Sequence, residues 1–132
     1  MKLLAIDYGE KRVGLATSDT EVNLALPHGV LARESDETLV KELIKLINTE
    51  NIAKIIIGSP MSLSGDKSDQ TRVVDSFVGL LKKQINIPVE MIDERLTSRQ
   101  ALHLGQGSSV RGKDELAAMF ILQDWMDRSK NV

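Results

Sequence analysis

The chain has 132 residues, of which 42% are hydrophobic and 27% are charged, values typical of one globular domain spanning residues 1–132. It contains no cysteine and only two histidines, which excludes disulfides, zinc–thiolate sites, iron–sulfur clusters, cysteine catalysis and a multi-histidine metal cage. The net charge of −2 argues against strong unspecific binding to nucleic acid, but it leaves room for a local basic patch.

The hydropathy pattern indicates no membrane partner. No apolar segment approaches the ~20 residues that a membrane span requires. Asp7 interrupts the first apolar run, so we expect no signal peptide. Together with the absence of cysteine, this pattern predicts a cytoplasmic protein.

The first third of the chain has the pattern of three strands. Lys2–Asp7 is apolar enough for a strand that is buried on both faces, and Gly9 allows a tight turn after it. Val13–Ser18 is then the second strand of a hairpin, and a third strand is expected near His28–Ala32, after Pro27.

Helices and strands alternate in the rest of the chain. The expected elements are a helix capped by Ser35 or Asp36, a buried strand at Lys54–Ile57, a polar loop at Ser59–Asp69, a helix at about Gln70–Lys83, a strand at Pro88–Ile92, a short helix from Thr97 or Ser98 to about Leu104, a flexible loop at Gly105–Gly112 and a last helix from near Lys113 to near Arg128. Helical spacing predicts that the three long helices bury Leu39, Val40, Leu43, Ile44, Leu46 and Ile47; Val73, Val74, Phe77, Val78, Leu80 and Leu81; and Ala117, Phe120, Ile121 and Trp125.

This order of elements predicts an α/β fold. Strands that are separated by helices should run parallel through right-handed crossovers, whereas the first three strands should be antiparallel. The expected architecture is a mixed five-stranded sheet with helices on both faces.

Acidic residues lie at the ends of the predicted strands. Asp7 ends the first strand, Asp93 and Glu94 end the last strand, and Asp114 opens the last helix. Ligand chemistry in such sheets gathers beyond the carboxyl ends of the parallel strands. Carboxylates that share one edge repel each other, and a hard cation such as Mg²⁺ is a common reason to bring them together. Two such ions about 4 Å apart can hold both the attacking and the leaving oxygen of a phosphodiester.

Four stretches, in this order, resemble the signature motifs of the YqgF/RuvX family. They are "IDYGEKRVGLATSD" at residues 6–19, "IIIGSPMSLSG" at residues 55–65, "DERLTS" at residues 93–98 and "KDELAAMFIL" at residues 113–122. The members of this family are described as Holliday junction resolvases and pre-16S rRNA nucleases with a ribonuclease H-like fold.

The resemblance implies metal-dependent endonuclease chemistry. By motif, the three acids of the family fall on Asp7, Glu94 and Asp114, which implies that they hold Mg²⁺ or Mn²⁺, as two ions. Two departures from the family pattern stand out. Ser62 replaces an Asn that many members carry, and the loop before Asp114 is about one residue shorter than in some relatives.

Each acid also has a structural interpretation. Asp7 is a residue type that favours a turn, here shortly before Gly9. Glu94 can form an ion pair with a neighbouring arginine, and Asp114 has a negative charge that is favourable at a helix N-terminus. Asp93 is expected to orient or cap rather than to bind metal, and Glu115 to be solvated or to support the site.

Basic and hydroxyl side chains near the acids form a candidate phosphate-binding rim. Its members are Lys11, Arg12, Ser62, Lys67, Arg72, Arg95, Arg99, Arg111 and Lys113. The alternative for each cation is a solvated surface charge.

The sequence therefore predicts a metal-dependent endonuclease that acts on structured nucleic acid. Processing of the 5′ end of pre-16S rRNA is the first expectation, and resolution of four-way, branched DNA is the second. A non-catalytic RNA-binding or ribosome-associated factor with the same fold is the rival from another class. The sequence leaves open whether the protein is a monomer or a homodimer.

Overall fold

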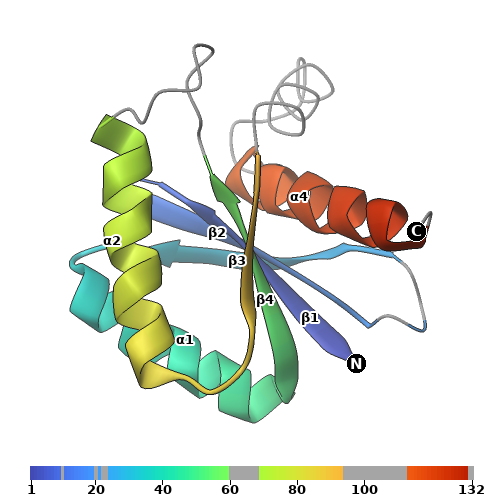
Figure 1. Ribbon diagram of the computed structural model, residues 1–132, viewed down its shortest axis with the longest axis horizontal. Helices are drawn as coiled ribbons and strands as arrows, with labels where there is room; N and C mark the ends of the chain where they lie inside the picture. The colour runs from blue at the N-terminus through green and yellow to red at the C-terminus, as the bar shows by residue number, and fades with distance from the viewer. Residues whose placement is uncertain (10, 20, 22–23, 60–68, 94–112, 131–132) are drawn as a thin grey trace.

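The computed structural model describes residues 1–9, 11–19, 21, 24–59, 69–93 and 113–130. It contains a five-stranded sheet and three long helices in this part of the chain (Figure 1). The strands are β1 (Lys2–Tyr8), β2 (Arg12–Asp19), β3 (Leu26–Ala32), β4 (Ile52–Ser59) and β5 (Val89–Asp93), and the helices are α1 (Asp36–Glu50), α2 (Asp69–Gln84) and α4 (Lys113–Lys130). None of the helices in these ranges is long and apolar enough to cross a membrane.

The sheet has the order β3-β2-β1-β4-β5, with β1 at its centre. β1 pairs antiparallel with β2 and parallel with β4, and the same pattern continues outward to β3 and β5. The predicted mixed sheet, antiparallel in its first three strands and parallel thereafter, is confirmed. Since β1, β4 and β5 are parallel, their carboxyl ends lie at one edge of the sheet, which we call the strand-end edge.

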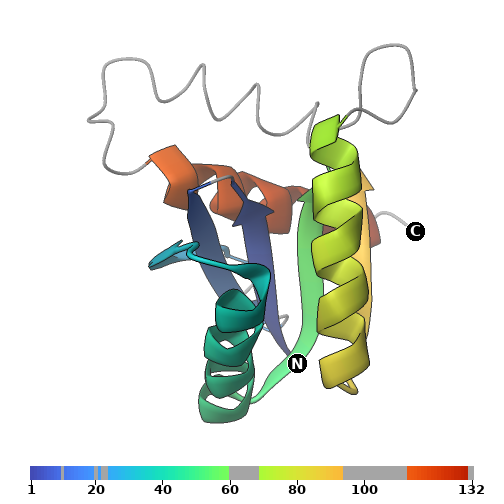
Figure 2. The ribbon, with the colours of Figure 1, turned by 90° about the vertical axis from the view of Figure 1, so that its left-hand side faces the viewer.

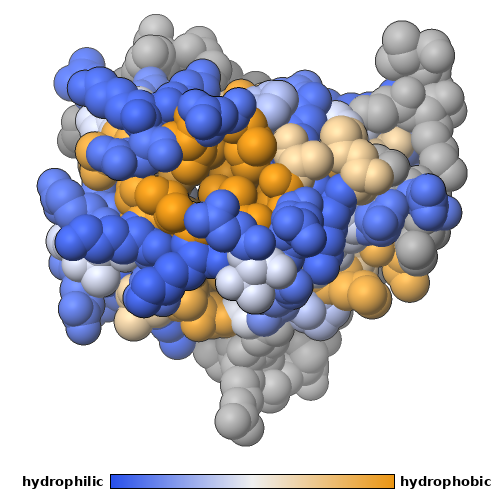
Figure 3. All heavy atoms as spheres, turned by 90° about the horizontal axis from the view of Figure 1, so that it is seen from below, coloured by the Kyte–Doolittle hydropathy of each residue, from blue (hydrophilic) through white to orange (hydrophobic). Residues whose placement is uncertain are grey.

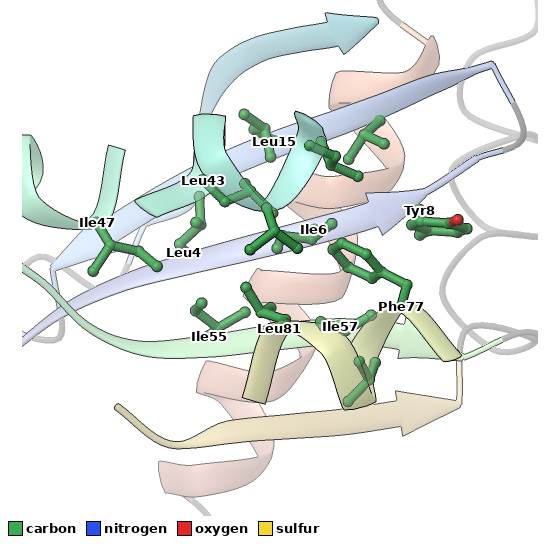
Figure 4. Packing of buried hydrophobic residues seen from close by; sticks show 14 of the residues in the cluster. Leu4, Ile6, Tyr8, Leu15, Leu43, Ile47, Ile55, Ile57, Phe77 and Leu81 are labelled. Carbon is green, nitrogen blue, oxygen red and sulfur yellow. The ribbon is translucent and has the colours of Figure 1, made fainter. Parts of the chain in front are cut away.

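Helices cover both faces of the sheet, as predicted. In Figure 2, α1 and α2 lie on one side of the strands and α4 lies on the other. The core correspondingly has two clusters, of which the one beneath α1 and α2 is shown in Figure 4. Side chains alternate between the two faces along β1: Leu4, Ile6 and Tyr8 belong to the first cluster, whereas Leu3 and Ala5 belong to the cluster beneath α4.

The start of α1 is fixed by a side-chain cap. Ser35 is the N-cap residue, and its hydroxyl accepts a hydrogen bond from the backbone N–H of Thr38 at 3.1 Å. Asn51 ends the helix in the left-handed conformation, with φ 54°. The prediction of a cap at Ser35 is confirmed.

Three details of the predicted elements were wrong. Val73 is 41% exposed, because the buried stripe of α2 follows Val74, Phe77, Val78 and Leu81, and Val73 lies about a quarter turn from that stripe. Five residues that were predicted to be buried are only half-buried, namely Ile44, Leu46, Leu80, Phe120 and Trp125. β3 begins two residues before its predicted start and includes a proline, which an edge strand tolerates because its outer side lacks a hydrogen-bonding partner strand.

The other predicted elements shift by one or two residues at their ends, and β4 is longer than its apolar run by two residues on each side. The predicted short helix ending at about Leu104 and the loop Gly105–Gly112 lie outside the described residues.

Apolar side chains also reach the surface below the sheet. In Figure 3, they gather in the middle of the lower face, and hydrophilic side chains surround them. A groove of about 330 Å³ lies between β3 and α1, with Leu15, Val30, Leu31 and Leu46 among its lining residues.

Candidate functional site

The strand-end edge gathers the backbone positions of several predicted site residues. Asp7 is the second-to-last residue of β1. It comes directly after Ile6, whose pairing with Ile57 is the last between β1 and β4. The last pair between β4 and β5 is Ser59–Asp93. In Figures 1 and 2, the N-terminal ends of α2 and α4 lie toward this edge, and Asp114 belongs to the first turn of α4.

Asp7 lies on the face of the sheet that α4 covers. It follows Leu3 and Ala5 at the two-residue spacing of a strand, and both of those side chains pack beneath α4. Its side chain is half-buried. A rigid central strand therefore delivers this carboxylate toward the helix whose first turn contains Asp114.

The remaining predicted site residues are described only in part. Ser62, Lys67, Glu94, Arg95, Arg99 and Arg111 lie outside the described residues, and for Asp93, Lys113, Asp114 and Glu115 only the backbone element is described. Among the side chains that the structure does describe, no group of three or more acidic or histidine residues is close enough to hold a metal ion. The predicted three-acid site is thus a proposal that rests on the placement of strand and helix ends.

Three of the predicted basic residues are described, and they share the edge. Lys11 and Arg12 are exposed at the β1–β2 turn, directly after the end of β1, and Arg72 is exposed in the first turn of α2. Exposed cations can contact the phosphates of a nucleic acid, which positions the backbone without reading the bases.

A partly buried network next to Asp7, made of Tyr8, Arg33 and Asp36, was not predicted from the sequence. The hydroxyl of Tyr8 donates a hydrogen bond to Asp36 Oδ1 at 2.6 Å, and Arg33 Nε donates to the same oxygen at 3.0 Å. The Tyr8 ring stacks on Phe77 with centroids 4.7 Å apart, and the Arg33 guanidinium lies 5.0 Å from the Tyr8 centroid.

The charges of this network shift two pKa values. Burial, followed by the hydrogen bond to the Asp36 carboxylate, raises the pKa of Tyr8 to about 12. Burial lowers the pKa of Arg33, but the hydrogen bond and the charge of Asp36 outweigh it, so that the pKa is raised. Arg33 precedes the N-cap Ser35 and is not part of the helix, so the spacing rule for ion pairs within a helix did not predict its pairing with Asp36.

A second polar cluster fastens α4 to the sheet. Glu90 Oε2, on β5, accepts hydrogen bonds from Trp125 Nε1 and Lys54 Nζ, both at 2.8 Å. Lys54 Nζ also lies 4.7 Å from the centroid of the indole ring. The hydrogen bond from Lys54, supported by the one from Trp125, lowers the pKa of Glu90. Trp125 is half-buried and packs against the cluster beneath α4, in agreement with its predicted core role.

Comparison with known proteins places this geometry in context. Residues 1–128 match the sequence model of the RuvX family, described as a Holliday junction resolvase. A protein of Maridesulfovibrio salexigens named "Putative pre-16S rRNA nuclease" is 36% identical over 135 residues, which cover 98% of this chain and 100% of that protein. A protein of Rickettsia africae with the same name is 35% identical over 136 residues, which cover 98% of this chain and 88% of that protein.

Two solved resolvase structures share the fold of this chain. T. thermophilus RuvC in complex with a Holliday junction substrate matches with a TM-score of 0.67 at 13% identity. The match covers 98% of this chain and 96% of the RuvC chain. The fowlpox virus resolvase in complex with Holliday junction DNA matches with a TM-score of 0.62 at 12% identity. The match covers 98% of this chain and 99% of the resolvase chain. This likeness confirms the predicted ribonuclease H-like architecture.

Proposed function

The chain belongs to the RuvX family, and from this premise we propose that it is a divalent-metal-dependent nuclease that hydrolyses phosphodiester bonds in structured nucleic acid. The proposed substrate is the precursor of 16S ribosomal RNA, processed at its 5′ end. The observation that supports this substrate is the name shared by relatives that are 35–36% identical over nearly the whole chain. In this proposal, residues 1–132 form one cytoplasmic domain.

The proposed metal ligands are Asp7, Glu94 and Asp114. Carboxylate oxygens are the ligands that Mg²⁺ and Mn²⁺ prefer, and the chain offers no thiol that would favour a softer metal. Asp7 fits this role because a buried central strand holds it at the strand-end edge, and Asp114 fits because α4 starts toward that edge. One or two bound cations would supply an activated water and stabilise the charge on the departing oxygen.

The protein's own residues bind and orient the substrate in this proposal. Lys11, Arg12 and Arg72 contact phosphates at the rim of the edge, and Ser62, Arg95, Arg99, Arg111 and Lys113 extend this rim. Such contacts fix the register of the backbone without reading the sequence of bases. Selection of the cleavage site then depends on the folded shape of the RNA.

Resolution of Holliday junctions is the second candidate function. The description of the family and the resolvases that share the fold favour it. Symmetric cutting of a four-way junction would require two sites related by a twofold axis, and hence a homodimer, whereas RNA processing is compatible with a monomer. A non-catalytic ribosome-associated factor is the third reading, and it is the weakest, because acids are retained at all three motif positions.

Cleavage of the two substrates side by side tests the proposal. Precursor 16S rRNA fragments and a four-way DNA junction are incubated with the purified protein in Mg²⁺, in Mn²⁺ or in excess chelator. We expect metal-dependent cleavage of the RNA at one position near the 5′ end of the mature sequence. Preferential, paired cuts in the junction would favour the resolvase reading. Activity that persists in chelator, or that is equal in a preparation of Asp7→Asn, would contradict the proposed site.

A further inference from the structure

We propose that Tyr8 is a positioning residue that fixes the carboxylate of Asp7 at the strand-end edge, with Asp36 and Arg33 as its anchor. This inference rests on the proposed function, because it deepens the role of the same site. Tyr8 does not touch the substrate in this account, and it acts through the backbone of β1.

Tyr8 is held at several points around its side chain. Its hydroxyl donates to Asp36 at 2.6 Å, a short hydrogen bond of the charge-assisted kind. Its ring stacks on Phe77 of α2, with an interplanar angle of 29°, and Arg33 lies over the ring. Figure 4 shows Tyr8 at the end of the packed row of buried side chains, with its oxygen directed away from that row. Only 4% of Tyr8 is exposed, and the packing around it therefore holds the side chain in one position.

The anchor itself is rigid. Asp36 is the first residue of α1, and the N-cap Ser35 immediately before it closes the first turn of the helix onto Thr38. A carboxylate at this position is also stabilised by the partial positive charge of the helix N-terminus. The Tyr8 hydroxyl is therefore tied to a fixed point of another element, 28 residues away in the sequence.

Because β1 is pleated, the hydrogen bond between Tyr8 and Asp36 also restricts the orientation of Asp7. Successive side chains in a strand point to opposite faces, so that fixing Tyr8 beneath α1 and α2 fixes the direction of Asp7 toward α4. Tyr8 is the last residue of β1 and pairs with Val13, whereas Asp7 pairs with Gly14. Without the tie, the strand end would be free to fray at the residue that carries the acid.

The turn after Asp7 is tied to the same anchor. The backbone N–H of Arg33 donates to the carbonyl oxygen of Lys11 at 2.9 Å. A Cβ at Gly9 would collide with the carbonyl oxygen of Arg12, so the turn closes tightly on itself. Arg33 thus connects both Tyr8 and the β1–β2 turn to the start of α1. A site in which like charges converge needs such a restraint, because repulsion would otherwise turn the Asp7 carboxylate away.

The test compares three variants that differ in whether they alter the hydrogen bond between Tyr8 and Asp36. Tyr8→Phe removes the hydroxyl but keeps the ring on Phe77. Ile47→Val is the matched control, because it removes one buried methyl group near the other end of the same helix without touching Tyr8, Arg33 or Asp36. Asp36→Asn is the conservative variant, since its amide oxygen still accepts a hydrogen bond from Tyr8. Each is measured for Mn²⁺ binding by calorimetry, for kcat and KM on the cleaved substrate, and for its melting temperature.

We expect Tyr8→Phe to weaken Mn²⁺ binding about tenfold and to lower kcat by about 10- to 100-fold, with KM within about twofold of the parent. Ile47→Val should melt earlier while it keeps both Mn²⁺ affinity and kcat, and Asp36→Asn should fall between the parent and Tyr8→Phe. Unchanged Mn²⁺ affinity and kcat in both Tyr8→Phe and Asp36→Asn would overturn the inference. So would losses that merely follow the melting temperature and appear equally in Ile47→Val.

These readouts also separate the inference from the proposed function. If the parent binds Mn²⁺ but cleaves no nucleic acid, the proposed function fails, and the calorimetry of Tyr8→Phe and Asp36→Asn still decides the role of Tyr8. If the parent cleaves and Tyr8→Phe matches it in rate and affinity, the inference alone fails. A parent that neither binds Mn²⁺ nor cleaves would overturn both.

Discussion

Replacement of Glu90 by glutamine should loosen the attachment of α4 to the sheet at neutral pH. The carboxylate receives two hydrogen bonds at 2.8 Å, one from Lys54 and one from the indole of Trp125. The Glu90 side chain is 45% exposed and that of Lys54 is 23% exposed, so that solvent screens their attraction and the ion pair contributes no more than about 1 kcal/mol. The amide oxygen of Glu90→Gln can still accept from Trp125, although without the charge. We therefore expect a loss of about 1 kcal/mol in the free energy of unfolding.

The pH dependence of this loss has a defined sign. Because the pKa of Glu90 is lowered by folding, its contribution to stability is present above its ordinary pKa of 4.5 and is lost as the pH falls through the lowered value. The difference between the parent and Glu90→Gln should therefore be largest at neutral pH and should shrink in the acid range below pH 4.5.

Urea unfolding provides the assay. Trp125 is the only tryptophan, so its fluorescence follows the attachment of α4, and circular dichroism checks that the whole fold melts with it. Glu42→Gln is the matched control, because Glu42 meets Lys45 at 3.8 Å with side chains that are 50% and 76% exposed. This pair should contribute less than about 0.5 kcal/mol. A Glu90→Gln protein as stable as the parent at neutral pH, or a difference that does not shrink in acid, would refute the reasoning.

Two further predictions concern the strand-end edge. Lys11→Ala and Arg72→Ala should weaken binding to unrelated nucleic-acid sequences about equally, and each should lower the slope of log K against log salt by about 0.7–0.9, as binding titrations at several salt concentrations would show. An unchanged slope in both variants would make these residues ordinary solvated charges. Gly9→Ala should lower the free energy of unfolding by about 1–3 kcal/mol, because the added Cβ meets the backbone of Arg12. A denaturation midpoint equal to that of the parent would instead show that the turn relaxes at no cost.

The sequence predicted the sheet well because its signals are local. An uninterrupted apolar run placed β1 in the buried centre, and the alternation of helices and strands after Ser35 predicted the parallel pairing of β1, β4 and β5. The error at Val73 has a physical reason: an apolar residue beside a buried stripe has the same composition signal as one within it. Only the packing of α2 on the sheet separates Val73 from Val74.

The candidate site was predictable in part. The position of Asp7 near the end of a buried strand was predicted from the apolar run before it, whereas its role in a site stays a prediction. The Tyr8–Asp36 and Trp125–Glu90 hydrogen bonds join residues 28 and 35 positions apart, and no local pattern encodes such pairs because they depend on how separate elements pack. Glu94 as the second acid stays a prediction from the motif.

The single-turnover cleavage rate of Asp7→Asn in Mg²⁺ tests the central claim most directly. The substitution keeps the shape of the side chain and removes one negative charge from the strand-end edge. If Asp7 helps to hold a catalytic cation, the loss of several kcal/mol of transition-state stabilisation should slow cleavage by about 10³-fold or more. The melting temperature in chelator should be equal to or above that of the parent, because charge repulsion at the edge is reduced. Cleavage within about tenfold of the parent rate would remove Asp7 from the active site and contradict the account.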